Sequence, residues 1–165
     1  MGTSMFSDPA ERSPLLRFFY RNWRPTRAGR WVNRLAARLT ELGFAGNEMA
    51  ILEVRGRASG RLRTSPVVVA TLDGRRYLVS MLGPDSGWVK NVEAASGEAF
   101  LRQRGRHAVQ LVPIPATERA PILREYVRVA TSGRRHLPVA VDAPLAEFEA
   151  ISDRYPVYQI AQRSL

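Results

Sequence analysis

The chain has 165 residues, of which 45% are hydrophobic, and it carries a formal net charge of +10. This size and composition suit one globular domain with a hydrophobic core. No uninterrupted apolar run of about 18 residues occurs, and the N-terminus lacks the pattern of a secretory signal, so we expect a cytoplasmic protein. The lack of cysteine excludes disulfides, and two distant histidines argue against a metal site.

All but one of the 25 basic residues are arginine, and Lys90 is the only lysine. Such a bias mostly reflects codon usage in a GC-rich genome, so we expect no nucleic-acid partner from charge alone. The strands predicted below also lack the alternating aromatic and basic pattern of a single-strand binder. Two basic groups need separate explanations: eight arginines that precede Thr40, and the group Arg55, Arg57, Arg61 and Arg63.

Residues 1–46 are predicted to form an amphipathic helical appendage. Ser13-Pro14 is suited to begin a first helix, which runs to about Trp23, and a second helix follows Gly29 and ends at Gly43. The apolar faces carry Leu15, Leu16, Phe19, Trp23, Trp31, Leu35 and Leu39. With arginine-rich polar faces, these helices suit an anionic membrane surface, and we expect peripheral association there. Two helices docked on a barrel would show the same stripe, so both readings stay open.

From Met49 the pattern changes to short β-type runs. These runs are 49–54, 65–72, 75–82, 98–104 and 107–114, and a last strand is expected over 155–161. Asp73-Gly74 is a strong hairpin signal and Arg104-Gly105 a weaker one. Helices are expected after Thr117 and after Asp142-Pro144. We therefore predict that 47–165 is one domain, an antiparallel sheet able to close into a barrel with helices packed on it.

The segment RGRASGRLRTSPVVVA, residues 55–70, places four arginines in a connection between two strands. Gly56 and Gly60 permit a loop whose backbone N–H groups form an anion nest. Arg57, Arg61 and Arg63 would surround this nest with side chains suited to phosphate or carboxylate. A solvated basic hairpin explains the composition equally well. The segment is neither a Walker loop nor a dinucleotide fingerprint, because no GK[ST] follows and the next element is a strand.

A second segment, residues 80–97, passes through Gly83-Pro84 and Ser86-Gly87 before reaching Trp88, Lys90 and Asn91. One interpretation is a loop that leads into a helix whose N-terminal N–H groups face the same anion, with Lys90 adding charge. The alternative is an ordinary loop with a tryptophan anchor. Other candidates are weaker. His107 and His136 are expected to be structural, and Tyr126, Tyr155 and Tyr158 suit either a substrate pocket or the core.

The sequence resembles the deazaflavin-dependent nitroreductase family, whose members are split-barrel reductases that use coenzyme F420. Three segments together carry this resemblance: GRASGRLRTSPVVV, DGRRYLVS and GWVKNVEA. The resemblance covers about residues 49–110, and the terminal RYPVYQIA has the expected style. It implies an α+β fold, a split β-barrel of the FMN-binding type with N- and C-terminal helices packed on it. It also implies F420 as the cofactor, with FMN as the alternative.

The resemblance implies a cofactor site in which arginines hold the anionic phosphate and polyglutamyl tail. Arg57, Ser59, Gly60, Arg63, Thr64 and Pro66 match the family's first motif, and Trp88 and Asn91 match its second. Ser80, Met81 and Leu82 would border the ring, with Ser80 as the catalytic residue and Lys90 assisting at the tail. Ala58 stands where the family has a basic residue, so that contact is missing or passes to Arg55 or Arg61. The loop before Trp88 is shortened to GPDSG, and Val89 replaces an aromatic residue.

The activity implied is transfer of a hydride from reduced F420 to a conjugated hydrophobic acceptor, such as a quinone, enone or nitroaromatic. No proton-transfer machinery is evident in the sequence, which suits chemistry performed by the cofactor. A non-catalytic lipid- or cofactor-binding barrel and an FMN-dependent oxidoreductase remain alternatives. The sequence leaves a homodimer open.

Overall fold

The computed structural model describes residues 20–21, 24–25, 48–131 and 133–163. The chain divides into two compact units, Met1–Gly43 and Phe44–Leu165. Our domain boundary between residues 46 and 47 falls on residues that are not described, so it stays a prediction. Most of the proposed amphipathic appendage, including all of its second expected helix, also lies outside the described residues.

Within the first unit, two short strands correct part of the sequence analysis. β1 (Tyr20–Arg21) pairs antiparallel with β2 (Arg24–Pro25). The helix that we expected up to Trp23 therefore does not include Tyr20 and Arg21. Pro25 contributes to this pairing, because a proline favours an extended conformation at the residue before it, and that residue, Arg24, pairs with Arg21.

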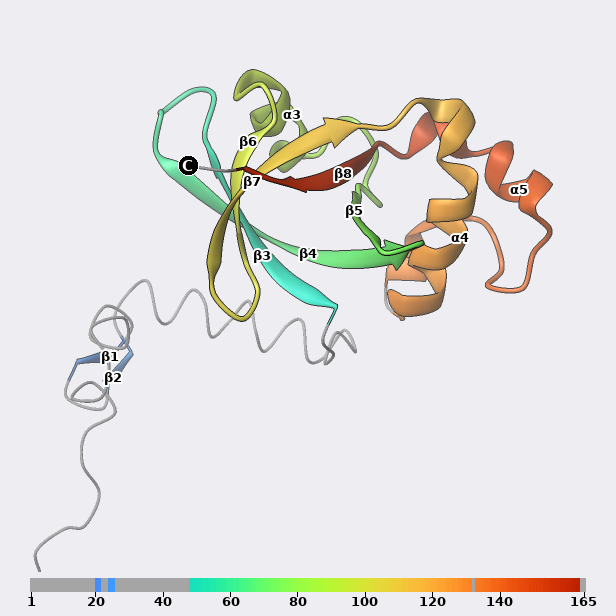
Figure 1. The fold of residues 1–165 in the computed structure, drawn as a ribbon, viewed down its shortest axis with the longest axis horizontal. Helices are drawn as coiled ribbons and strands as arrows, with labels where there is room; N and C mark the ends of the chain where they lie inside the picture. Colours follow the sequence, from blue (N-terminus) through green and yellow to red (C-terminus); the bar gives the residue numbers. More distant parts are fainter. Residues whose placement is uncertain (1–19, 22–23, 26–47, 132, 164–165) are drawn as a thin grey trace, which may run out of the picture. The chain divides into compact units, whose positions relative to one another are not determined.

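The second unit is built on a closed barrel of antiparallel strands (Figure 1). The strands are β3 (Met49–Arg55), β4 (Leu62–Leu72), β5 (Arg75–Val79), β6 (Glu98–Arg102), β7 (Arg106–Pro113) and β8 (Val157–Gln162). Their order around the barrel is β3-β4-β5-β8-β7-β6, and β6 pairs back onto β3. The predicted antiparallel barrel is confirmed.

Both predicted hairpins are present. Asp73 and Gly74 have φ values of 50° and 72° and connect Leu72 directly to its partner Arg75. Two consecutive residues with positive φ match the right-handed twist of the flanking strands. At the other hairpin, Arg104 and Gly105 have φ values of 53° and 137° between β6 and β7.

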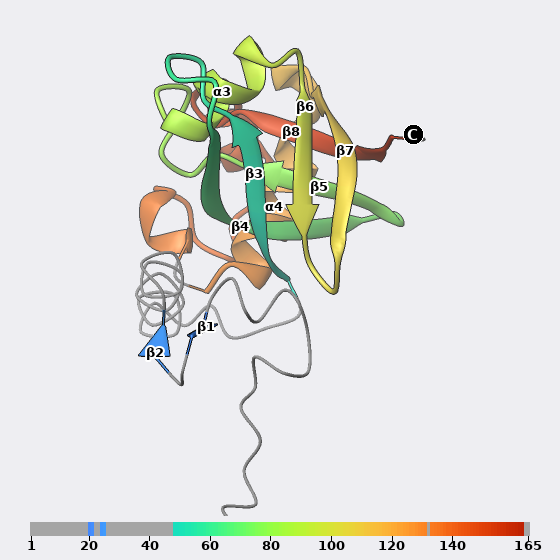
Figure 2. The same ribbon diagram turned by 90° about the vertical axis from the view of Figure 1, so that its left-hand side faces the viewer.

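One hydrophobic cluster fills the barrel interior. Large side chains that are fully buried there include Leu52, Leu78, Leu101 and Leu111. Helix α3 (Gly87–Ala94) adds Val89 and Val92 to this cluster. Figure 2 shows α3 beside the connection between β3 and β4. The barrel core therefore fixes the position of α3 against the strands.

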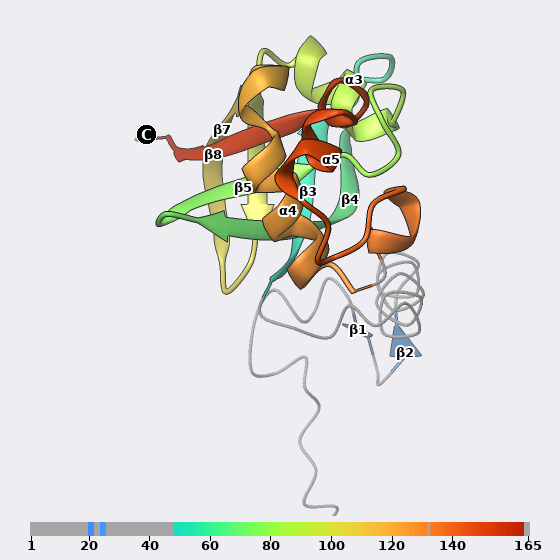
Figure 3. The same cartoon turned by 90° about the vertical axis from the view of Figure 1, so that its right-hand side faces the viewer.

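A second cluster lies between the outer face of the barrel and the C-terminal helices. It contains Val68, Tyr77 and Val157 of the strands, together with side chains of α4 (Ala120–Val129) and α5 (Leu145–Glu149). Figure 3 shows these two helices on one side of the barrel. The described part of this unit also contains three 3-10 helices: Ala116–Glu118, Gly133–His136 and Ser152–Arg154. No helix in the described ranges is long and apolar enough to cross a membrane.

Several element boundaries differ from the sequence prediction. β4 begins at Leu62, earlier than residue 65, and runs through Pro66. From Leu62 to Val68 this strand pairs with β3, whereas its pairing with β5 begins only at Val69. At Pro66, the side of β4 away from β3 has no partner among the described strands. The backbone N–H that proline lacks would point to that side, so Pro66 costs the sheet no hydrogen bond.

Two further boundaries depend on local hydrogen bonds. β5 ends at Val79, short of residue 82, because Ser80 starts a turn in which the N–H of Gly83 donates to the Ser80 carbonyl at 3.1 Å. Thr117 does not cap α4. It lies in a 3-10 helix instead, and α4 begins at Ala120.

Candidate functional site

The loop between β3 and β4, residues 56–61, is closed by its own backbone. The Gly56 N–H donates to the Arg61 carbonyl, and the Gly60 N–H donates to the Gly56 carbonyl, both at 2.8 Å. Gly60 has a φ of +66°, which favours glycine, whereas a side chain at Gly56 would crowd the Arg61 carbonyl and Arg63. The glycines thus shape the loop. Their N–H groups do not form the anion nest that we expected, because both donate within the loop.

Asn91 of α3 holds this loop. Its side-chain oxygen Oδ1 accepts a hydrogen bond from the Arg57 backbone N–H at 3.2 Å and another from Arg57 Nη1 at 2.9 Å. Asn91 is only 8% exposed, whereas Arg57 is exposed. The structure therefore brings together the two segments that the sequence analysis singled out.

Four exposed arginines surround the loop: Arg55, Arg57, Arg61 and Arg63. Arg55 Nη1 donates to the Gly60 carbonyl at 3.1 Å, and the Arg61 N–H donates to Ser59 Oγ at 3.4 Å. No aspartate or glutamate occurs from residue 55 to 72. The loop therefore has a positive charge without a local carboxylate in its own sequence.

The nearest preceding carboxylate, Glu53, is already paired. Glu53 Oε1 lies 3.2 Å from Arg102 Nη1, and Glu53 Oε2 lies 2.7 Å from Arg106 Nε. The Arg106 guanidinium also stacks on Phe100, 3.6 Å from the ring centroid. Glu53 is buried, so these two arginines compensate its charge within the barrel wall and not at the loop. This buried carboxylate was not anticipated from sequence, where Glu53 is simply a polar residue within a strand.

Ser80 is 1% exposed and its hydroxyl is engaged inside a turn. The hydroxyl donates to the Gly83 carbonyl at 2.7 Å. A carbonyl oxygen can only accept, so this bond uses the single hydroxyl hydrogen of Ser80. In the 3.0 Å contact between Ser80 Oγ and Ser86 Oγ, the Ser86 hydroxyl is therefore the donor. Ser80 therefore shapes the turn that leads into α3, and its catalytic role stays a prediction.

The other residues predicted to border the cofactor occupy different environments. Leu82 is 65% exposed, and Met81 is partly buried against the second hydrophobic cluster, between the barrel and the C-terminal helices. Thr64 and Pro66 are partly buried and lie on the same face of β4 as Val68, because side chains alternate along a strand. Ser59 and Gly60 are exposed in the loop itself.

Two contacts fix the remaining residues of α3. The rings of Trp88 and Tyr158 meet edge to face, with centroids 5.7 Å apart and an interplanar angle of 62°. Lys90 Nζ forms an ion pair with Asp85 Oδ1 at 2.8 Å, and this partner lowers the pKa of Asp85. Lys90 thus already has a carboxylate partner, which reduces the charge that it offers to an anionic ligand.

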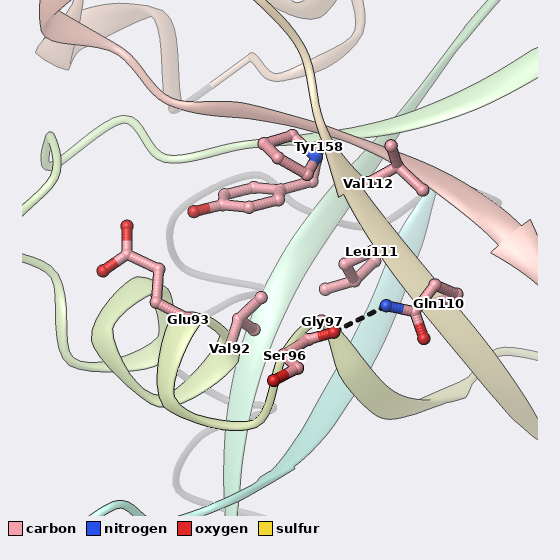
Figure 4. Close-up of a pocket in the computed structure, with 9 residues that line it drawn as sticks. Val92, Glu93, Ser96, Gly97, Gln110, Leu111, Val112 and Tyr158 are labelled. Atoms are coloured by element: carbon pink, nitrogen blue, oxygen red, sulfur yellow. Dashed lines mark hydrogen bonds between the residues drawn. The ribbon is translucent and has the colours of Figure 1, made fainter.

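A pocket of about 400 Å³ lies elsewhere, against α3, β7 and β8 (Figure 4). Its lining residues are Val92, Glu93, Ser96, Gly97, Gln110, Leu111, Val112, Pro113 and Tyr158. Of these, the sequence analysis considered only Tyr158 as a pocket residue. The other walls could not be anticipated, because they meet only when β7 closes against the end of α3. Within the described ranges, no group of three or more His, Asp or Glu side chains is placed to hold a metal ion.

Residues 27–144 match the sequence model of the F420H(2)-dependent quinone reductase family. The chain belongs to this family. Membership implies coenzyme F420 as the cofactor, which confirms the expectation from the sequence motifs. We found no match among curated protein sequences.

Two solved structures with TM-scores of 0.54 and 0.50 support the fold. A protein of unknown function from Agrobacterium tumefaciens shares 12% identity at a TM-score of 0.54, over 79% of this chain and 55% of that one. A heme-binding protein from Mycobacterium smegmatis shares 11% identity at a TM-score of 0.50, over 78% of this chain and 51% of that one. This chain thus spans about half the length of each. An F420-H2 dependent reductase is 20% identical at a TM-score of 0.46, over 68% and 93% of the two chains.

The residues of the β3–β4 loop fit an anionic cofactor. Guanidinium groups bind phosphate and carboxylate through paired donors, and the loop presents four of them without an acidic neighbour in its sequence. The bond from Arg57 to Asn91 restrains one of these side chains before any ligand binds. Restraint of this kind reduces the entropy lost on binding.

Proposed function

We propose that this protein is an F420H2-dependent reductase that delivers a hydride to a conjugated, hydrophobic acceptor such as a quinone, an enone or a nitroaromatic. Family membership supports the use of reduced F420, and the acceptor class is our inference. The observation that carries the proposal is the attachment of Arg57 to Asn91. This attachment joins the loop of residues 56–61, called the basic loop below, to α3, and it supports the proposal that the two segments bind the cofactor together.

In this proposal the basic loop binds the phosphate and carboxylates of the cofactor tail. Arg57 and Arg63 provide the main contacts, while Arg55 and Arg61 take the place of the basic residue that Ala58 replaces. All four arginines are exposed and thus accessible to a ligand. Lys90 assists only if it exchanges Asp85 for the ligand, since the two form an ion pair. Ser59, Gly60, Thr64 and Pro66 are proposed to border the tail.

The turn that follows β5 is proposed to border the ring. Reduced F420 supplies the hydride, and the protein positions the donor and acceptor rings against one another. Met81 and Leu82 provide apolar contacts, and Trp88 is held in place by Tyr158. Ser80 orients this turn through Gly83 and Ser86. It is our candidate for polarising the ring, a role that requires its hydroxyl to exchange the Gly83 carbonyl for the ring.

The test is a parallel fluorescence titration of the purified protein with oxidised F420, FMN and FAD. We expect F420 to bind more tightly than both flavins. Reduced F420 should then be oxidised by a soluble quinone such as menadione in the presence of catalytic amounts of protein. Preference for FMN would contradict the cofactor assignment. Tight F420 binding without turnover on a panel of quinones, enones and nitroaromatics would instead support a non-catalytic carrier.

A further inference from the structure

The pocket beside Tyr158 has a buried floor and an exposed rim (Figure 4). Val92, Leu111 and Tyr158 form the floor and are each at most 5% exposed. Glu93 and Val112 are exposed and lie at the rim. Most of the lining is apolar, and a cavity of about 400 Å³ falls within the size range of small-molecule sites.

The walls of this pocket are held by specific contacts. Gln110 Nε2 donates to the Ser96 carbonyl at 2.7 Å, and the Leu111 N–H donates to the Gly97 carbonyl at 2.8 Å. Gly97 has a φ of +84°, and a side chain there would lie 2.5 Å from the Leu111 carbonyl oxygen. The close approach of β7 to the end of α3 therefore requires glycine at this position.

The charge of this pocket is opposite to that of the whole chain. The net charge is +10, yet Glu93 is the only lining residue that is charged at neutral pH. Figure 4 shows the Glu93 carboxylate and the Tyr158 hydroxyl at the same end of the pocket. Burial, and secondarily the charge of Glu93, raises the pKa of Tyr158 to about 12, against an opposite effect of Arg119, which does not line the pocket. The Tyr158 hydroxyl therefore stays protonated at neutral pH. This end of the pocket thus presents one carboxylate and one neutral hydroxyl.

We infer that the pocket binds a small, mainly apolar molecule that carries a protonated amine. The apolar body would contact Val92, Leu111 and Val112, and the amine would pair with the Glu93 carboxylate beside Tyr158. A carboxylate or phosphate ligand would face Glu93 and be repelled. The pocket is therefore distinct from the basic loop, whose arginines select anions, and it shares no residue with the proposed F420 site.

Three probes with the same apolar body test this inference by isothermal titration calorimetry at low salt. The probes are 1-naphthylmethylamine, 1-naphthylmethanol and 1-naphthoate, and the full chain is titrated without F420. We expect the amine to bind about two- to fivefold more tightly than the alcohol, the range expected for one partly exposed ion pair. The carboxylate should bind most weakly.

Two substitutions in the pocket locate the site, and a third on α5 serves as the control. Glu93→Gln should remove the preference for the amine over the alcohol, whereas Glu149→Gln, an exposed acid on α5, should leave it unchanged. Val112→Arg, at an exposed strand position, should shift the preference toward the carboxylate. The inference is wrong if none of the probes binds, if amine and carboxylate bind equally, or if Glu93→Gln leaves the preference intact. Because no step uses F420, the outcome is independent of the proposed reductase activity.

Discussion

The side-chain oxygen of Asn91 accepts both a main-chain and a side-chain hydrogen bond from Arg57, at 3.2 and 2.9 Å. One residue of α3 thus fixes the backbone of the basic loop and the direction of one of its guanidinium groups. A buried acceptor of this kind links the stability of the domain to the geometry of the proposed cofactor site. The first prediction separates these two contributions.

Asn91→Ala should reduce the free energy of unfolding by about 1–3 kcal/mol, because both bonds to Arg57 are lost. It should also weaken F420 binding, since the loop is no longer restrained. Asn91→Asp keeps an oxygen acceptor and should retain most of the F420 affinity. Urea unfolding and F420 titration measure the two effects. Unchanged affinity in Asn91→Ala would show that the restraint does not matter for the cofactor.

Arg57→Ala and Arg63→Ala should each weaken F420 binding by roughly 10- to 150-fold, the effect of one charge-assisted hydrogen bond. Turnover at saturating F420 should barely change, because these contacts are the same in the ground state and the transition state. Arg124→Ala, an exposed arginine on α4, serves as the matched control. Affinities within about twofold of wild type for both loop variants would exclude the tail-binding role.

Ser80→Ala should lower turnover more than F420 affinity if the hydroxyl polarises the ring. The variant also loses the hydrogen bonds to Gly83 and Ser86. A control must therefore separate the effect of a distorted turn from the loss of ring polarisation. Ser86→Ala removes one bond of the same turn and leaves Ser80 in place. A similar loss of turnover in both variants would show that Ser80 acts only through the turn. Steady-state rates at saturating F420 provide the comparison.

The raised pKa of Tyr158 predicts a loss of stability at high pH. The folded protein releases this proton at about pH 12, whereas an unfolded tyrosine releases it near its ordinary value of 10.0. The stabilising contribution is therefore complete below pH 10 and is lost as the pH rises toward 12. Tyrosinate absorbance should show a smaller late-titrating component in Tyr158→Phe than in the wild type, and the part that remains belongs to Tyr126, whose pKa is also raised by burial. Glu93→Gln should lower this pKa, and an unchanged titration would contradict the contribution of Glu93.

The N-terminal residues are predicted to associate with an anionic membrane surface, and most of them lie outside the described part of the chain. Eight arginines precede Thr40, and each basic residue near an anionic surface contributes about 1 kcal/mol. The full chain should sediment with anionic liposomes more than a truncated chain that begins at Asn47. Neutral liposomes control for charge. Equal binding of the two chains would exclude a membrane role, whereas misfolding of the truncated chain would favour helices docked on the barrel.

The strands could be located from sequence because apolar residues and hairpin residues gave consistent local signals. Asp73-Gly74 fixed one hairpin by its backbone preference alone. The end of β5 could not be predicted, because Ser80 has the composition of a strand residue and turns only through its bonds to Gly83 and Ser86. The start of β4 was also placed too late, since pairing with β3 extends the strand through residues with little hydrophobic character.

The basic loop was recognisable as a candidate site because its arginines are adjacent in sequence. Its attachment to Asn91 depends on residues 34 positions apart and follows from the packing of α3 on the barrel. The pocket at Tyr158 was hidden for the same reason, because Glu93 and Val112 belong to different elements. Local patterns therefore identified the chemistry of single segments, and long-range packing determined which segments meet.

The pairing of β4 gives the arginines a further consequence, for solubility. From Leu62 to Val68 the strand pairs with β3, and no other described strand pairs with it there. An open strand edge is a template for uncontrolled association with another chain, and natural proteins protect such edges with proline and charged side chains. Pro66 removes one donor from this edge, and Arg61 and Arg63 place positive charges at its start. Replacing these arginines with apolar residues should therefore favour aggregation as well as remove the proposed contacts to an anionic cofactor.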